Sequence, residues 1–227
     1  MWTRSLARTA RQVMPSPVFD WTRRIGSAIL TPIFFSHRSG HFRSCLRQVP
    51  LDCHGAPLPW YTYPTIHFLE TKDLRDKTVL EFGAGYSTLW WASHVKSVVA
   101  FEDNRGWYDR LLAKVPPNVK LVYVEDSKPE LLGAFDIIIV DGLERGHCIK
   151  LASRLLALNG AIVADDSEGY GWNGHSSIVG PLCDDGFSRI DFYGYAPGVS
   201  LPRCTSVLFR CSTFLLSDLG DPRRLVF

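Results

Sequence analysis

Residues 78–91 read T-V-L-E-F-G-A-G-Y-S-T-L-W-W, an apolar run that ends in an acid and leads through two glycines into a helix. A strand that is apolar at nearly every position is typical of a parallel sheet covered on both faces. Gly83 and Gly85 allow a sharp turn and let a ligand approach the backbone. The following helix offers unpaired N–H groups and the positive end of its dipole. The pattern predicts a nucleotide-type site after a first strand, although a tight turn without a ligand would share it.

The alternation of strands and helices continues along the chain. We predict strands at residues 78–82, 97–101, 120–124, 136–140 and 161–164. We predict helices at residues 64–74, 87–93, 104–115 and 146–158, and a short helical turn at 129–132. Asn104 is a good N-cap for the third helix, and Asn159-Gly160 is a C-cap signal for the last. Strands that alternate with helices in this way indicate an α/β fold with a parallel, doubly wound sheet.

Two more strands are expected near the C-terminus, at residues 188–193 and 205–210. The loop between them is rich in glycine and proline, which suits a hairpin-like connection and therefore an antiparallel last strand. A cluster of aromatic residues at 57–63 precedes the first strand. These side chains could line a pocket or pack the core, because aromatic residues are common in both.

The N-terminal segment differs in charge from the rest of the chain. Residues 1–50 hold eight Arg and one acid, Asp20, whereas the remainder holds 17 basic and 22 acidic residues. We therefore divide the chain into a basic arm, residues 1–56, and a main domain, residues 57–227. The arm contains a helical pattern at 2–13 and an apolar piece at 25–35 that is short of the ~20 residues of a bilayer span. It could touch an anionic membrane surface or a partner, pack as a cap on the domain, or act as a transit peptide.

Composition places the chain among ordinary globular proteins. The net charge of +2 by itself implies nothing about nucleic acid, and we expect no nucleic-acid partner. None of the six cysteines has the spacing of a metal site, and several lie in apolar elements. We expect free thiols in a reducing compartment. No signal-peptide layout is present. The expected location is the cytoplasm, or a membrane surface if the arm binds one.

The glycine stretch distinguishes between nucleotide cofactors. The dinucleotide fingerprint requires glycine or alanine three residues after the second glycine, and Thr88 occupies that place. The segment E-F-G-A-G, with its acid before the first glycine, resembles motif I of the class I S-adenosylmethionine-dependent methyltransferases. The resemblance covers roughly residues 75–210. It implies a Rossmann-like, mostly parallel seven-stranded sheet with an antiparallel last strand, and S-adenosylmethionine as the cofactor.

The predicted strands end in acids, and in an open parallel sheet those ends face one crevice. Glu102 follows the glycines by about twenty residues, where an acid can bind ribose hydroxyls, although it could instead complement a helix dipole. The resemblance assigns Asp126, with Ser127, to the adenine amino group, and either could instead cap a helical turn. The expected cofactor-binding residues are Glu81, Gly83, Ala84, Gly85, Ser87, Glu102, Asp103, Asp126, Ser127 and Asp141.

Asp141 ends the fourth strand, a position that in the resembling family faces the reacting methyl group and the substrate. If the acceptor is a hydroxyl, a base must take its proton. Our candidates, in order, are Asp141, Asp166 and His147, with His175 as a further histidine. Asp141, Asp165 and Asp166 could alternatively converge on Mg²⁺, as in catechol and caffeoyl-coenzyme A O-methyltransferases. Asp166 replaces the Asn of those enzymes, and we favour polar capping or proton transfer over a metal.

The sequence thus predicts methyl transfer from S-adenosylmethionine to a small-molecule or glycan hydroxyl. Two alternatives stay open: another Rossmann-like enzyme that uses NAD or a nucleotide sugar, and a binding module that keeps the cofactor site without turnover. Loops at 54–64, 142–148 and 167–186 are expected to shape the acceptor site, because loops vary most between related proteins.

Overall fold

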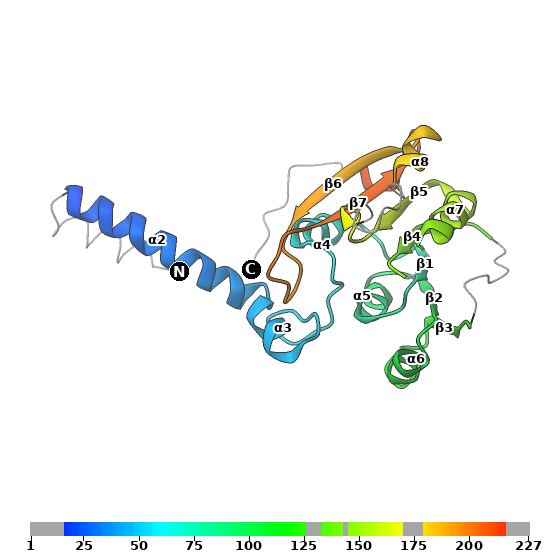
Figure 1. The fold of residues 1–227 in the computed structure, drawn as a ribbon, viewed down its shortest axis with the longest axis horizontal. Coiled ribbons are helices and arrows are strands. Elements are labelled where there is room, and N and C mark those ends of the chain that lie inside the picture. The colour runs from blue at the N-terminus through cyan, green and yellow to red at the C-terminus, as the bar shows by residue number, and fades with distance from the viewer. Residues whose placement is uncertain (1–15, 126–132, 143–144, 170–178, 217–227) are drawn as a thin grey trace.

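The computed structural model describes residues 16–125, 133–142, 145–169 and 179–216. A seven-stranded sheet with the order β3-β2-β1-β4-β5-β7-β6 forms its centre (Figure 1). Neighbouring strands pair in parallel from β3 to β5, and β7 is antiparallel to both β5 and β6. This confirms the predicted sheet and its reversed last strand. The strands are β1 (Thr78–Phe82), β2 (Ser97–Glu102), β3 (Val119–Tyr123), β4 (Phe135–Val140), β5 (Leu156–Ala164), β6 (Ser188–Gly194) and β7 (Arg203–Phe209).

The predicted end of the last core helix was wrong. Helix α7 (Arg145–Leu155) gives way directly to β5, which begins at Leu156 rather than at residue 161. The reason lies at Gly160, which is inside the strand instead of capping a helix. A Cβ there would lie 2.7 Å from Asp136 O and 2.8 Å from Leu156 Cδ1, so only glycine allows this close approach of β5 to β4. The pairing of the two strands shifts register at this place.

Two other helices are shorter than predicted. Helix α4 ends at Glu70, where Thr71 N donates to Phe68 O at 3.3 Å, three residues back, and the Thr71 hydroxyl donates to the same carbonyl at 2.7 Å. Helix α6 ends at Leu112, before the two prolines of the next turn. Asn104 caps α6 as predicted and accepts from Trp107 N at 3.0 Å. The helices are α2 (Ser16–Arg38), α3 (His41–Arg47), α4 (Tyr63–Glu70), α5 (Tyr86–His94), α6 (Arg105–Leu112), α8 (Gly180–Asp184) and the 3-10 helix η2 (Phe214–Leu216).

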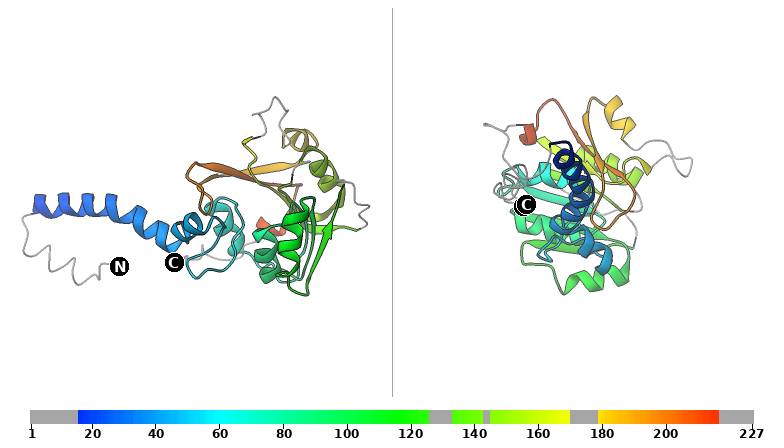
Figure 2. Two further views of the ribbon diagram at one scale, coloured as in Figure 1. Left: turned by 60° about the horizontal axis from the view of Figure 1, so that its bottom comes forward. Right: turned by 90° about the vertical axis from the view of Figure 1, so that its left-hand side faces the viewer.

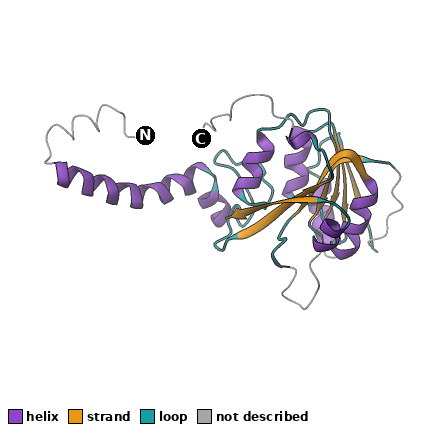
Figure 3. Ribbon diagram, turned by 90° about the horizontal axis from the view of Figure 1, so that it is seen from above, coloured by secondary structure: helices purple, strands orange, loops and turns teal. Residues whose placement is uncertain are grey.

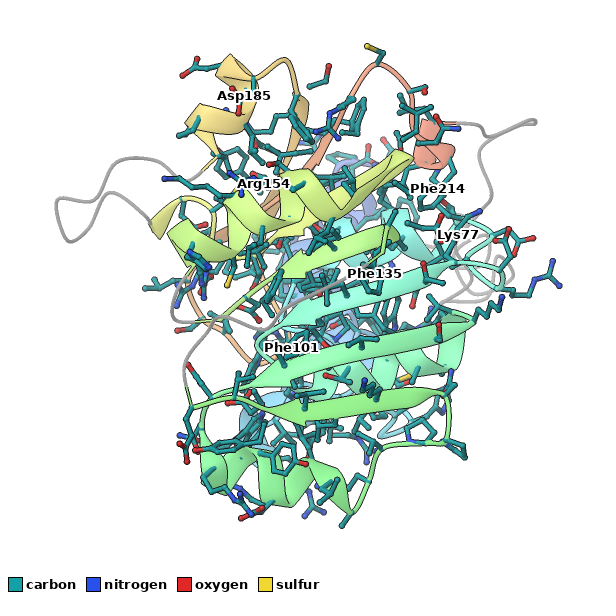
Figure 4. The ribbon with its side chains drawn as sticks, turned by 90° about the vertical axis from the view of Figure 1, so that its right-hand side faces the viewer. Lys77, Phe101, Phe135, Arg154, Asp185 and Phe214 are labelled. Carbon is teal, nitrogen blue, oxygen red and sulfur yellow. The ribbon has the colours of Figure 1, made fainter. Side chains whose placement is uncertain are left out.

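Helices cover both faces of the sheet (Figure 3). Alternate residues of each strand point to opposite faces. Val79 and Ile139 pack with α4, α5 and α6, whereas Leu80 and Ile138 pack with α7 and α8. Figure 4 shows the strands side by side, with Lys77 at the edge where β1 begins and Phe101 toward the opposite edge, where β2 ends. The carboxyl ends of the parallel strands thus share one edge.

The arm has two parts that differ in burial. Helix α3 packs on the domain, because Ser44 is buried and its backbone contacts the loop at Gly198. Helix α2 has no buried residue and extends away from the sheet (Figures 1 and 2). It continues through Pro32. The helix predicted at 2–13 and the turn at 129–132 lie outside the described residues, and the boundary at residue 56 stays a prediction.

Within the described ranges, no helix combines the length and apolar character needed to cross a bilayer. All six cysteines are free thiols. Buried Cys148 and Cys204 lie in α7 and β7, so they act as small apolar core residues.

Candidate active site

The glycine bend after β1 is fixed by its neighbours. Gly83 N and Ala84 N both donate to Phe101 O at 3.0 Å, which ties the bend to β2. Gly83 has φ +95°, and a Cβ there would lie 2.8 Å from the carbonyl carbon of Asp141. At Gly85 the nearest atom to an added Cβ is Ser87 Oγ, at 3.5 Å. Gly83 is therefore required by the fold, whereas Gly85 leaves space beside the bend.

Beneath the bend, Glu81 is fully buried at the end of β1. Thr88 Oγ1 donates to Glu81 Oε2 at 2.5 Å and accepts from Gly85 N at 2.9 Å. Glu81 Oε1 accepts no hydrogen bond from any described residue. Burial raises the pKa of Glu81 to about 8, against the lowering effect of the Ser87 and Thr88 hydroxyls. The Ser87 hydroxyl is thus close to the carboxyl, but among the described residues no hydrogen bond of normal geometry reaches Glu81 Oε1.

Glu102 ends β2 and is 6% exposed. Its Oε1 accepts from Asn104 N at 2.8 Å, so the carboxyl lies at the turn into α6. Burial raises the pKa of Glu102, and this N–H partly opposes the shift. Trp107 joins α6 to the glycine bend, because its Nε1 donates to Ala84 O at 2.7 Å. Asp103, which we also expected to bind cofactor, is partly exposed beside this turn.

At the end of β4, Asp141 pairs with Arg145 from the first turn of α7. Arg145 Nη2 lies 3.1 Å from Asp141 Oδ1, and the same guanidinium donates to Asp165 O at 2.7 Å and Gly142 O at 2.9 Å. Burial raises the pKa of Asp141 to about 7 in spite of the Arg145 cation, and Asp166 and Glu102 raise it further. Asp141 is thus an acid that can hold or release a proton near neutral pH.

Arg145→Met is expected to raise the pKa of Asp141 from about 7 to about 8 or above, because the cation that favours the carboxylate is lost. The measurement is a carboxyl ¹³C NMR titration, with Asp141→Asn used to assign the signal. Arg203→Met is the control, since Arg203 pairs with Asp166 at 3.3 Å. A similar upward shift in both variants would mean that Arg145 has no specific effect on Asp141.

Asp165 lies at the end of β5 and is 4% exposed. Its Oδ1 accepts from Thr205 Oγ1 at 2.7 Å, and that hydroxyl accepts from Thr62 N at 3.0 Å. This chain of contacts connects β5, β7 and the segment before α4. Burial raises the pKa of Asp165 well above its usual range, and the neighbouring Asp141 and Asp166 add to the rise. Asp165 therefore favours its protonated form and serves as a buried bridge between elements.

The three acids of the less favoured metal alternative have other partners. Asp166 has φ +47° and forms an ion pair with Arg203. Ser167 and Glu168 continue the loop and bind the backbone of Cys204. No group of three or more His, Cys, Asp or Glu within the described ranges is arranged to hold a metal ion. The loop after β5 is thus fastened to β7.

Tyr61 contributes a phenol to the same edge. It is fully buried, and Trp91 Nε1 donates to its hydroxyl at 3.1 Å. Burial raises the pKa of Tyr61 well above 10, and the nearby Glu81, Asp141 and Asp165 raise it further. Of the two interpretations of the aromatic cluster, Tyr61 fits both, because it packs in the core and lies close to the acids.

The predicted site acids that the structure describes lie at one edge of the sheet, because they are close enough to raise one another's pKa. These acids are Glu81, Glu102, Asp141, Asp165 and Asp166. Their roles toward a ligand stay predictions, as do those of Ala84 and of Ser87, which is buried at the start of α5. His147 is partly exposed in the first turn of α7, and within the described residues it forms no hydrogen bond or ion pair with Asp141 or Asp166. Asp126, Ser127 and His175 lie outside the described residues.

Sequence reasoning missed three residues that organise this edge. Thr88 was noted only for replacing a glycine, yet it bridges Glu81 and the bend. Arg145 follows Asp141 by four residues, a spacing that could have indicated an ion pair within one turn. Trp107 gave no such signal, because nothing in the pattern showed that its indole reaches Ala84.

Comparisons with known proteins relate this fold to others. No protein-family model matches the chain, and neither does any curated protein. Among solved structures, the precorrin-6y C5,15-methyltransferase of Geobacter metallireducens is similar, with a TM-score of 0.53 and 18% identity over 64% of this chain and 86% of the other. A methyltransferase of Pyrococcus furiosus has a TM-score of 0.52 and 19% identity over 81% of this chain and 98% of the other.

Both structures are methyltransferases by name, and their alignments cover most of their own chains. The chain has the fold of the class I methyltransferases. Within this methyltransferase fold, the bend at Gly83 and the acids that end β1, β2, β4 and β5 lie where ligands bind in open α/β sheets, at the carboxyl ends of the strands.

Proposed function

We propose that the protein transfers a methyl group from S-adenosylmethionine to a hydroxyl of a small-molecule or glycan acceptor. One observation carries the proposal: a glycine bend surrounded by buried strand-end acids, one of which, Glu81, keeps an oxygen that no described residue satisfies. An unpaired buried carboxyl oxygen is costly unless a ligand supplies a donor.

The residues of this edge fit the proposed cofactor. Glu81 Oε1 would accept from the ammonium group of its methionine part, and Glu102 would accept from the ribose hydroxyls. Beside Gly85 an added Cβ would meet no atom closer than Ser87 Oγ at 3.5 Å, and the cofactor would lie against this stretch of backbone. In both assignments a carboxylate oxygen accepts hydrogen bonds from donor groups of the cofactor. Roles for Asp126 and Ser127 at the adenine remain part of the proposal.

Bound S-adenosylmethionine supplies an electrophilic methyl group, and the protein must position the acceptor and remove its proton. Asp141 suits the second task, because a base with a pKa near the working pH is most effective. Arg145 would orient Asp141 through their 3.1 Å contact. Asp166 and His147 are the next candidates. The acceptor class, the absence of a nucleic-acid partner and the cytoplasmic location stay predictions from the sequence.

The alternatives are separated by ligand binding. Isothermal titration calorimetry with S-adenosylmethionine, S-adenosylhomocysteine and NAD should give micromolar binding of the first two and none of the third. Thr88 also counts against NAD. It stands where the dinucleotide fingerprint requires a third glycine or alanine, and its hydroxyl donates to Glu81. Binding of NAD alone would overturn the proposal. Binding of S-adenosylmethionine without methylation of any hydroxyl acceptor would favour the non-catalytic module.

Glu102→Gln is expected to weaken S-adenosylmethionine binding by about 1–3 kcal/mol, because the ribose hydroxyls lose a charged acceptor. Glutamine keeps an oxygen for Asn104 N, so the turn into α6 should survive. Asp109→Asn is the control, since it removes an exposed carboxylate of the same helix, where Asp109 pairs with Arg105 at 3.1 Å. Equal affinity of Glu102→Gln and wild type, measured by calorimetry, would remove the ribose assignment.

A further inference from the structure

Helix α2 carries a continuous row of exposed apolar side chains, which we call the α2 stripe. Its members are Val18, Trp21, Ile25, Ile29 and Ile33, each between 39% and 65% exposed. They follow one another at intervals of three or four residues, so they lie on one side of the helix. None of α2 is buried. Large exposed apolar surfaces of this kind mark binding sites on folded proteins.

The other side of α2 is basic. At about 100° per residue, Arg23, Arg24 and Arg38 project away from the α2 stripe, together with the single acid Asp20. Residues 1–50 carry a formal charge of +7, whereas the remainder of the chain carries −5. The arm is therefore both amphipathic and strongly basic, and the domain is mildly acidic.

The C-terminal end of α2 is attached to the domain. The Phe35 ring meets Tyr63 of α4 edge-on, with 5.3 Å between the ring centroids, and Ser39 Oγ donates to Phe35 O at 2.7 Å. From this anchor the helix extends away from the sheet (Figures 1 and 2). The domain therefore presents the α2 stripe without covering it.

We propose that the α2 stripe binds the surface of an anionic lipid bilayer, with α2 lying in the plane of the interface. An apolar face beside a basic face is the pattern of interfacial helices, and Trp21 suits the headgroup region. Anionic lipid attracts the arm and repels the acidic domain, which would favour one orientation. Pairing with a second copy would bring together two segments that each carry +7 over residues 1–50, so charge repulsion disfavours a dimer at this surface.

The test is sedimentation of the full chain with vesicles. Phosphatidylcholine vesicles containing 30% phosphatidylglycerol should retain the protein, whereas pure phosphatidylcholine vesicles should retain at least ten-fold less. Ile25→Ser/Ile29→Ser should lower partitioning to anionic vesicles by at least ten-fold. Phe34→Ser is the matched control: Phe34 is also exposed, but it lies nine residues from Ile25, on the opposite side of the helix, and its loss should change partitioning less than two-fold.

Every outcome of this test bears on the proposal. Circular dichroism should show an intact domain in all variants, since no α2 side chain is buried. Equal retention on neutral and anionic vesicles, or equal losses in the two variants, would overturn it. A second outcome would also overturn it: the wild type binds no vesicles but forms a dimer in analytical ultracentrifugation, and Ile25→Ser/Ile29→Ser converts that dimer to monomer. Cofactor is absent throughout, so failure here is separate from failure of the methyl-transfer proposal.

Discussion

Gly83→Ala is expected to destabilise the folded protein by about 3 kcal/mol or more, because alanine adds backbone strain and a steric clash at one position. The φ of +95° is a conformation that residues with a Cβ rarely adopt. The new methyl would also lie 2.8 Å from the backbone of Asp141, which directly follows β4 and continues its pairing with β1, since Asp141 N donates to Phe82 O at 2.9 Å. Backbone atoms of a paired strand cannot give way without disturbing the sheet, so the loss should appear in urea unfolding monitored by circular dichroism.

Gly85→Ala is the informative companion. Its Cβ would have no neighbour closer than 3.5 Å, so the variant should fold with nearly wild-type stability. It should nevertheless bind S-adenosylmethionine at least about ten-fold more weakly if the cofactor lies against this backbone. Gly106→Ala in α6 controls for the substitution itself, because its Cβ meets only Asn104 Oδ1 at 3.6 Å. Unchanged stability in Gly83→Ala, or unchanged affinity in Gly85→Ala, would contradict the two roles.

The topology could be predicted from the sequence because each strand has its own signal. Five apolar runs end in acids, and turn residues separate them from helices. The order of the strands comes from the structure, because the right-handedness of parallel crossovers limits the possible orders without selecting one. Residues 156–158 could not be assigned in this way. Leu156, Ala157 and Leu158 suit a helix or a strand equally, and only the close packing of Gly160 against Asp136 decides for the strand.

The sequence could predict the location of the candidate site but not the hydrogen bonds and ion pairs within it. The positions of Glu102 and Asp141 follow from strand ends, which periodicity locates well. The partners of these acids depend on side-chain reach across elements. Thr205 reaches Asp165 from a strand 40 residues away, a contact that no local pattern encodes. Helix α2 likewise extends beyond the apolar piece at 25–35 and runs through Pro32, because in an exposed helix water can satisfy the carbonyl that loses its N–H partner.

Glu81→Gln is expected to remove a large part of the pH dependence of stability. The pKa of Glu81 is about 8 in the folded protein, against an ordinary value of 4.5. Between these values the folded state keeps a proton that the unfolded state releases. The stabilisation is therefore complete below pH 4.5 and is lost as pH rises to 8, by about 5 kcal/mol in total. Urea unfolding of the wild type should show this decline, and the glutamine variant should show a smaller slope and greater stability than wild type at pH 8.

The same residue links pH to cofactor affinity. A bound ammonium group would stabilise the Glu81 carboxylate and lower its pKa, so binding should expel the proton. Affinity for S-adenosylmethionine should then rise by up to about ten-fold per pH unit between pH 5.5 and 7, below the range where the α-amino group of the ligand itself titrates. Calorimetry in buffers of different ionisation enthalpy should count about one proton released by wild type and fewer by Glu81→Gln. If the affinity of wild type and of Glu81→Gln depended on pH in the same way, Glu81 would have only a structural role. A carboxylate that does not contact the ligand cannot couple its own proton to binding.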